Sequence, residues 1–140
     1  MKLLDKADFS VIYQAERASD KDLFKEFNLT EDEYVRLTSR YPSVGFEIDN
    51  KCVGGLFIRQ DKIHLSVLPE YHGKWGFLFT PAFKWAFSVT DPLKAVVNVN
   101  NEKVIRFIER HDWRLIDQQG STLIYLLTDQ TTRYPNEFCT

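Results

Sequence analysis

The chain has 140 residues, a length that suits one domain with a sizeable hydrophobic core. Hydrophobic residues make up 44% of it and charged residues 27%, a balance that argues against disorder. The formal net charge of -2 excludes a general basic field, so broad nucleic-acid binding is not expected.

Other features of the composition indicate where the protein works. No apolar run approaches the roughly 20 residues that a membrane helix needs, and the charged start of the chain does not fit a signal peptide. Cys52 and Cys139 lie far apart, and neither they nor the three histidines have the spacing of a metal site. We therefore expect a reduced, cytoplasmic protein without membrane partner or metal.

The first 42 residues predict a short strand followed by three helical segments. The strand is expected at residues 1–4 and the helices at residues 7–17, 20–27 and 30–40. Asp8 is expected in the first turn of the first helix. Thr30 and Glu33 have capping-box spacing, which marks the start of the third helix. Pro42 ends that helix, because proline cannot continue one.

From residue 44 the hydrophobic period changes to two, the period of a strand. Three strands joined by short turns are expected at residues 44–48, 52–59 and 63–67. They predict an antiparallel meander. The next helix is expected to begin at Thr80, with Pro81 in its first position, or near Trp75 with a kink at Pro81. Asp91 and Pro92 break it.

The last third of the chain predicts a strand, a helix and two more strands. They are expected at residues 94–98, 101–111, 113–117 and 121–128. The stripe expected to be buried on the helix consists of Val104, Ile105, Phe107 and Ile108. The order β-α-α-β-β-β-α-β-α-β-β predicts an α/β fold with a mixed sheet and helices on both faces. We expect one domain over residues 1–128 and an irregular tail over residues 129–140.

The connection between the third meander strand and the next helix carries the strongest functional signal. A strand that runs through a glycine-bearing turn into a helix can aim main-chain N–H groups and the positive helix end at one point. Proteins hold phosphate in this way. Gly73 and Gly76 allow such a turn, whereas Trp75 and Phe77 place large side chains in it.

This connection resembles the pyrophosphate turn of the GCN5-related N-acetyltransferase (GNAT) family, whose usual form is Val-x-Pro-x-x-(Arg/Gln)-x-x-Gly-x-(Gly/Ala). Val67 and Pro69 fit that form, and His72 takes the Arg/Gln position. Trp75 and Phe77 stand where the family has its small residues. The chain thus keeps the frame of the turn and departs from it at two positions.

A second patch resembles the later part of the same family, Val-x-x-x-Asn-x-x-Ala-x-x-x-Tyr-x-x-x-Gly-Phe. Val97 and Asn101 fit it, Val104 replaces the alanine, and Ile108 stands where the family often has tyrosine. Because both patches occur in the family's order, the chain is similar to a GNAT fold over nearly its whole length.

The resemblance implies acetyl-CoA as cofactor and an acyl-CoA-dependent N-acetyltransferase, or a degenerate descendant with an eroded cofactor loop. The acceptor would be a small-molecule or protein amine. The residues implied to contact the cofactor are Val67, His72, Gly73, Lys74, Trp75, Gly76, Phe77 and Asn101. The alternative is a strand, turn and helix with a purely structural role.

The reaction that the resemblance implies needs a base for the amine and often an acid for the departing thiolate. His64, with an ordinary pKa of about 6.5, and Glu47 are the candidate bases, although each also fits a polar position on a half-exposed strand. Ile108 cannot donate a proton and belongs to the apolar stripe. The tyrosines that remain as substitutes, without a spacing that places them, are Tyr71, Tyr125 and Tyr134.

A narrower similarity supports a second hypothesis. Residues 97–101, followed by residues 105–108, look like small tailed-bacteriophage proteins of virion assembly or DNA ejection. That similarity implies a non-catalytic scaffold in the host cytoplasm, with virion proteins bound through aromatic surface. The replacements at residues 75, 77 and 108 favour it, whereas the order of elements and the surviving glycines favour the enzyme.

Overall fold

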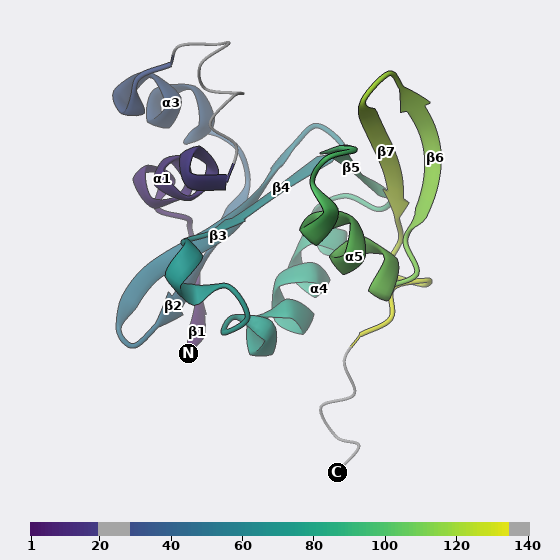
Figure 1. Ribbon diagram of the computed structural model, residues 1–140. Helices are drawn as coiled ribbons and strands as arrows, with labels where there is room; N and C mark the ends of the chain where they lie inside the picture. The colour runs from purple at the N-terminus through teal and green to yellow at the C-terminus, as the bar shows by residue number, and fades with distance from the viewer. Residues whose placement is uncertain (20–28, 135–140) are drawn as a thin grey trace. The chain divides into compact units, whose positions relative to one another are not determined.

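The computed structural model describes residues 1–19 and 29–134. These residues form a mixed α/β fold, as the sequence predicts, with a seven-stranded sheet in the order β1-β2-β3-β4-β5-β7-β6 (Figure 1). The chain divides into two compact units, residues 1–59 with 64–82 and residues 60–63 with 83 onward. Each unit is described by itself. The helix predicted at residues 20–27 lies outside the described residues.

The first unit contains the N-terminal strands and two helices. Their bounds are β1 Lys2–Leu4, α1 Phe9–Ser19, α3 Glu31–Thr38, β2 Ser43–Ile48, β3 Lys51–Arg59 and β4 Lys62–Val67. The first two residues of β4 belong to the second unit. β2 pairs antiparallel with both β1 and β3. Asp49 and Asn50, both with positive φ, form the turn between β2 and β3.

Side-chain caps set where the two helices of the first unit begin. The capping box is confirmed, because the Glu33 amide donates to Thr30 Oγ1 at 3.2 Å and the Thr30 amide donates to Glu33 Oε1 at 3.4 Å. Asp8 was expected in the first turn of α1, but it precedes the helix. Its Oδ1 accepts from the Ser10 amide at 3.0 Å, so a carboxylate placed one residue earlier caps the helix.

The core of the first unit lies between these helices and the sheet. The buried side chains that form one cluster there are Ala7, Phe9, Ile12, Tyr13, Tyr34 and Phe57. β4 runs close to β3 at Gly54, where a Cβ would lie 2.4 Å from the carbonyl oxygen of Ser66. Only glycine allows this approach, because that distance is shorter than any real contact.

Two 3₁₀ turns, η1 Pro69–Tyr71 and η2 Gly76–Leu78, lead from β4 into α4 Phe79–Val89. The helix begins at Phe79, so both predicted starting points are wrong. Pro81 stands in the first turn, where its missing N–H has no helical partner to lose, so no kink is needed. Thr80 does not cap the helix, and its buried hydroxyl makes no hydrogen bond within the described part of the chain.

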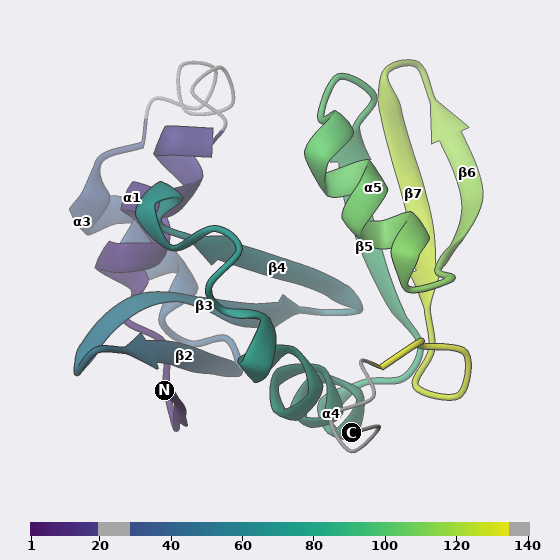
Figure 2. The same cartoon turned by 60° about the horizontal axis from the view of Figure 1, so that its bottom comes forward.

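The second unit consists mainly of three strands and one helix. The bounds are β5 Leu93–Asn98, α5 Glu102–Arg110, β6 Arg114–Gln119 and β7 Thr122–Leu127. β5 pairs in parallel with β4 at Lys62 and Lys94, and β7 pairs antiparallel with β5 and β6. Figures 1 and 2 show α5 alongside β5 and β7. Of its predicted buried stripe, Ile108 is buried, but Val104 is 37% exposed.

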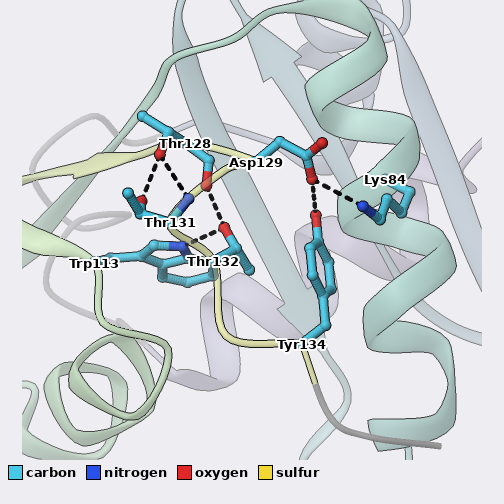
Figure 3. A network of polar contacts seen from close by, with 7 residues as sticks. All are labelled: Lys84, Trp113, Thr128, Asp129, Thr131, Thr132 and Tyr134. Atoms are coloured by element: carbon cyan, nitrogen blue, oxygen red, sulfur yellow. Dashed lines mark hydrogen bonds and ion pairs between the residues drawn. The ribbon is translucent and has the colours of Figure 1, made fainter. Parts of the chain in front are cut away.

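Residues 128–134 contain turns, and side chains hold them to the rest of the second unit (Figure 3). The buried Trp113 indole donates Nε1–H to Thr132 Oγ1 at 2.8 Å. Asp129 accepts from Lys84 Nζ at 3.2 Å and from the Tyr134 hydroxyl. Within the described residues, no helix has the length and apolar character to cross a membrane.

We expect the Trp113–Thr132 hydrogen bond to be measurable in a double-mutant cycle. Trp113→Phe and Thr132→Val each remove one partner, and the pair should show a coupling of about 1 kcal/mol in the free energy of unfolding, because both groups are buried. Urea unfolding of the two single variants and the double variant gives this value. A coupling of zero would show that the bond contributes nothing to stability.

Candidate functional site

The connection from β4 to α4 satisfies part of its hydrogen-bonding capacity internally. The amide of Tyr71 donates to the carbonyl of Leu68 at 2.9 Å, and that of Lys74 donates to Tyr71 at 3.0 Å. Each bond tightens the chain into a short turn. Gly73 lies between them with a φ of +83°, a left-handed conformation that glycine adopts without strain. The two glycines expected to permit this turn are both part of it.

Three main-chain amides of the same connection remain available. Those of Gly73, Gly76 and Phe77 make no hydrogen bond within the described part of the chain, and all three residues are exposed. They precede α4, whose N-terminus adds the positive end of the helix dipole. A run of donors beside a helix N-terminus is the arrangement that holds an anion in many proteins.

Trp75 lies against the buried Phe46 of β2. Its ring stacks on that of Phe46 at 5.4 Å between centroids and 6° between planes, and it meets Phe79 at 6.3 Å. No atom other than those of the chain neighbours lies within 4 Å of a Cβ built on Gly73. The rings of Trp75 and Phe77 therefore leave that space open, and Phe77 is 77% exposed.

His72 and Lys74 turn toward their own segment. His72 Nε2 lies 2.7 Å from the carbonyl oxygen of Val67, so the imidazole donates an N–H to the end of β4 and closes the turn. Lys74 Nζ lies 5.8 Å from the ring centroid of Tyr71, a cation–π contact at an exposed position. Contacts of both side chains with a cofactor stay predictions.

The two candidate bases lie on different strands with different partners. The half-buried His64 ring lies flat on that of Phe57, with 4.6 Å between centroids and 7° between planes. Glu47 Oε1 lies 3.9 Å from Lys2 Nζ on β1, and the Glu47 side chain is 22% exposed. A pair of this length with one exposed partner stabilises little. A catalytic role for either residue stays a prediction.

In the second unit, Asn101 and Ile108 support α5. Asn101 Oδ1 accepts from the amide of Val104 at 3.3 Å, so Asn101 is the N-cap of the helix. Ile108 is 2% exposed, and the position where the family often has tyrosine has no hydroxyl. The cofactor contact predicted for Asn101 stays a prediction.

Sequence reasoning missed a group of rings beside His64. Tyr41 stacks on Phe57 at 6.1 Å between centroids and 17° between planes, and Arg40 Cζ lies 5.4 Å from the Tyr41 ring centroid. The register of the β2–β3 hairpin is the signal that could have located this group. Ser43 pairs with Phe57, which places Tyr41 opposite Arg59 just beyond the paired part of β2.

Sequence comparisons alone do not place the chain, because no family model and no curated protein matches it. Solved structures do. The PaiA N-acetyltransferase of Thermoplasma acidophilum in complex with coenzyme A matches with a TM-score of 0.66 and 15% identity, over 91% of this chain and 98% of that one. The N-acetyltransferase PseH of Campylobacter jejuni, in complex with acetyl coenzyme A, matches with a TM-score of 0.60 and 18% identity, over 91% of this chain and 96% of that one.

A third similar structure is a chimera of the spermidine N-acetyltransferase SpeG of Vibrio cholerae and hSSAT, with a TM-score of 0.65 and 14% identity over 93% of this chain and 97% of that one. The likeness covers almost the full length of both chains in each comparison. The chain therefore has the GNAT fold, as the two sequence patches indicated. At these identities the likeness defines the fold and leaves the activity open.

From the positive φ of Gly73 we predict how a substitution there changes the free energy of unfolding. Gly73→Ala should lower the free energy of unfolding by about 1 kcal/mol, because a Cβ is disfavoured in this backbone conformation. Gly76→Ala is the matched control. Its φ is not positive and no atom beyond its chain neighbours approaches its Cβ position, so its effect should stay within about 0.5 kcal/mol. Equal effects in urea unfolding would contradict the left-handed turn.

Proposed function

We propose that this protein binds acyl-CoA and is a GNAT-fold N-acetyltransferase or a descendant that keeps the cofactor site. The observation that carries the proposal is the set of three amides, at Gly73, Gly76 and Phe77, that make no hydrogen bond within the described part of the chain. Such a set accepts anionic groups, a diphosphate among them. No atom beyond the chain neighbours crowds the Cβ position of Gly73.

The residues of the turn would bind the cofactor mainly through their main chain. Main-chain N–H groups would hold the diphosphate, so the replacement of small residues by Trp75 and Phe77 removes no donor. The Trp75 ring is engaged with Phe46. The backbone and side chains of residues 63–67 would lie along the pantetheine arm. When bound, acetyl-CoA supplies the thioester that an acceptor amine attacks.

The candidate base and the candidate acid of the reaction differ in how well the structure supports them. His64 is the better candidate for the base that takes a proton from the acceptor amine, because imidazole changes charge near neutral pH. Glu47 has the weaker case, because its carboxylate lies beside the ammonium group of Lys2. Ile108 offers no proton to the departing thiolate, so we expect slow transfer even where binding is intact.

The acceptor we propose is a small-molecule amine. One of the similar structures is a chimera of a spermidine N-acetyltransferase, and that similarity supports an acceptor of this class. The second hypothesis, a virion assembly or ejection scaffold, finds no counterpart among the structures reported above. No observation of the fold favours it, and it stays a prediction.

Calorimetry with CoA tests the proposal at a single amide. We expect the unaltered protein to bind CoA, and Phe77→Pro to weaken binding about tenfold, because proline removes one N–H donor to an anion. Phe77→Ala keeps the donor and should bind within about threefold of the unaltered protein. Pantetheine, which lacks the diphosphate, should bind all three proteins alike.

Two outcomes would contradict the proposal. One is no heat of binding with the unaltered protein at millimolar CoA. The other is an equal loss in Phe77→Ala and Phe77→Pro, which would assign the effect to the ring instead of the amide. Urea unfolding of both variants establishes beforehand that each is folded.

A further inference from the structure

A stack of three rings crosses the first unit beside the β2–β3 hairpin. Tyr41, Phe57 and His64 stack with interplanar angles of 17° and 7°. The three residues come from the segment before β2, from β3 and from β4. Phe57 is buried, whereas Tyr41 and His64 are partly exposed. The stack therefore presents a phenol and an imidazole on the same side of these strands.

Two arginines lie at the Tyr41 end of this stack. Arg40 Cζ lies 5.4 Å from the centroid of the Tyr41 ring. Arg59 follows Phe57 by two residues on β3, so the two side chains share a face of the strand. The amide of Ile58 donates to the carbonyl of Pro42 at 3.0 Å, which continues the hairpin register toward Tyr41 and Arg59.

Both arginines also act electrostatically on the Tyr41 hydroxyl. The pKa of Tyr41 lies below its ordinary value because the Arg40 side chain hydrogen-bonds to it and because the positive charges of Arg59 and Arg40 are near. Partial burial opposes this shift. The phenol therefore lies in a positive local field.

Within residues 1–19 and 29–134, no carboxylate lies within 4.0 Å of either guanidinium group. The chain as a whole has 20 acidic and 18 basic residues, so it does not lack acidic partners in general. Two like charges beside one phenol repel each other. An anion between them would relieve that repulsion.

We propose that Arg40, Arg59 and the Tyr41 hydroxyl form a binding site for a carboxylate or phosphate group. Guanidinium groups present planar, paired donors that match both oxyanions, and a phenol adds a third donor. On the basis of the proposed function, this group belongs to the acceptor, whose amine then lies toward His64. The acceptor is accordingly an amine that also carries an anionic group.

The site is tested without the cofactor. Isotope-labelled protein is titrated separately with succinate and with inorganic phosphate, and the Nε–Hε signals of Arg40 and Arg59 are followed by NMR. We expect both signals to shift saturably with at least one of the two anions. The tighter of the two identifies whether the group is a carboxylate or a phosphate.

Variants separate a built site from general screening of charge. Arg40→Gln and Arg59→Gln should each weaken the anion about fivefold or more, because each removes a charged pair of donors. Arg114→Gln, an exposed arginine on β6, is the control and should bind as the unaltered protein does. Because all three side chains are exposed, folding should survive each change, and far-UV circular dichroism establishes that it does.

The proposal is overturned if neither anion shifts the two signals saturably, or if Arg114→Gln weakens binding as much as the other two variants. Since the titration contains no CoA, a protein that fails to bind CoA can still pass this test. A protein that binds CoA can equally fail it. The two proposals therefore stand or fall separately.

Discussion

The stack of the Trp75 indole on the buried Phe46 ring is the interaction on which the connection between β4 and α4 depends. That connection forms several internal hydrogen bonds, but the amides of Gly73, Gly76 and Phe77 make none within the described part of the chain. A turn that leaves several amides unpaired gains from another source of order. An aromatic pair provides it, because offset or parallel rings contribute beyond the area that they bury.

This arrangement explains how a phosphate-binding frame tolerates two bulky replacements. The contacts that such a frame offers come from main-chain N–H groups, which every residue except proline possesses. A side chain harms the frame only where it fills the space in front of those groups. The Trp75 ring is stacked on Phe46 and Phe77 is exposed, so the change of residue type altered the surroundings of the donors and left the donors in place.

Much of the fold could be predicted because its signals are local. The capping box of Thr30 and Glu33 and the period-two strands each depend on a few adjacent residues, and the structure has them. Asp8 and Pro81 were misplaced by one or two positions, because the same residue types suit a cap and a first turn. Helix boundaries are the part of a fold that local signals determine least.

The candidate site was predictable only in part, for a related physical reason. The segment of Gly73 and Gly76 could be recognised from the order of strand, turn and helix. The direction of the Trp75 ring could not, because it depends on Phe46, which lies far away in the sequence. The same holds for Tyr41 and Arg59, which only the register of the β2–β3 hairpin brings together.

β4 lies between the two proposed sites and keeps their anions apart. His64 ends the ring stack, and Val67 ends β4 just before the turn that leads to Gly73. Three residues of a strand span about 10 Å, and the two arginines lie at the Tyr41 end of the ring stack, so one compact anion cannot reach both places. The diphosphate and the second anion must therefore be separate groups, one on the cofactor and one on the acceptor. An acceptor with its amine and its anion adjacent, as in an α-amino acid, would place the amine beside Tyr41, whereas a longer spacer would bring it along β4 past His64.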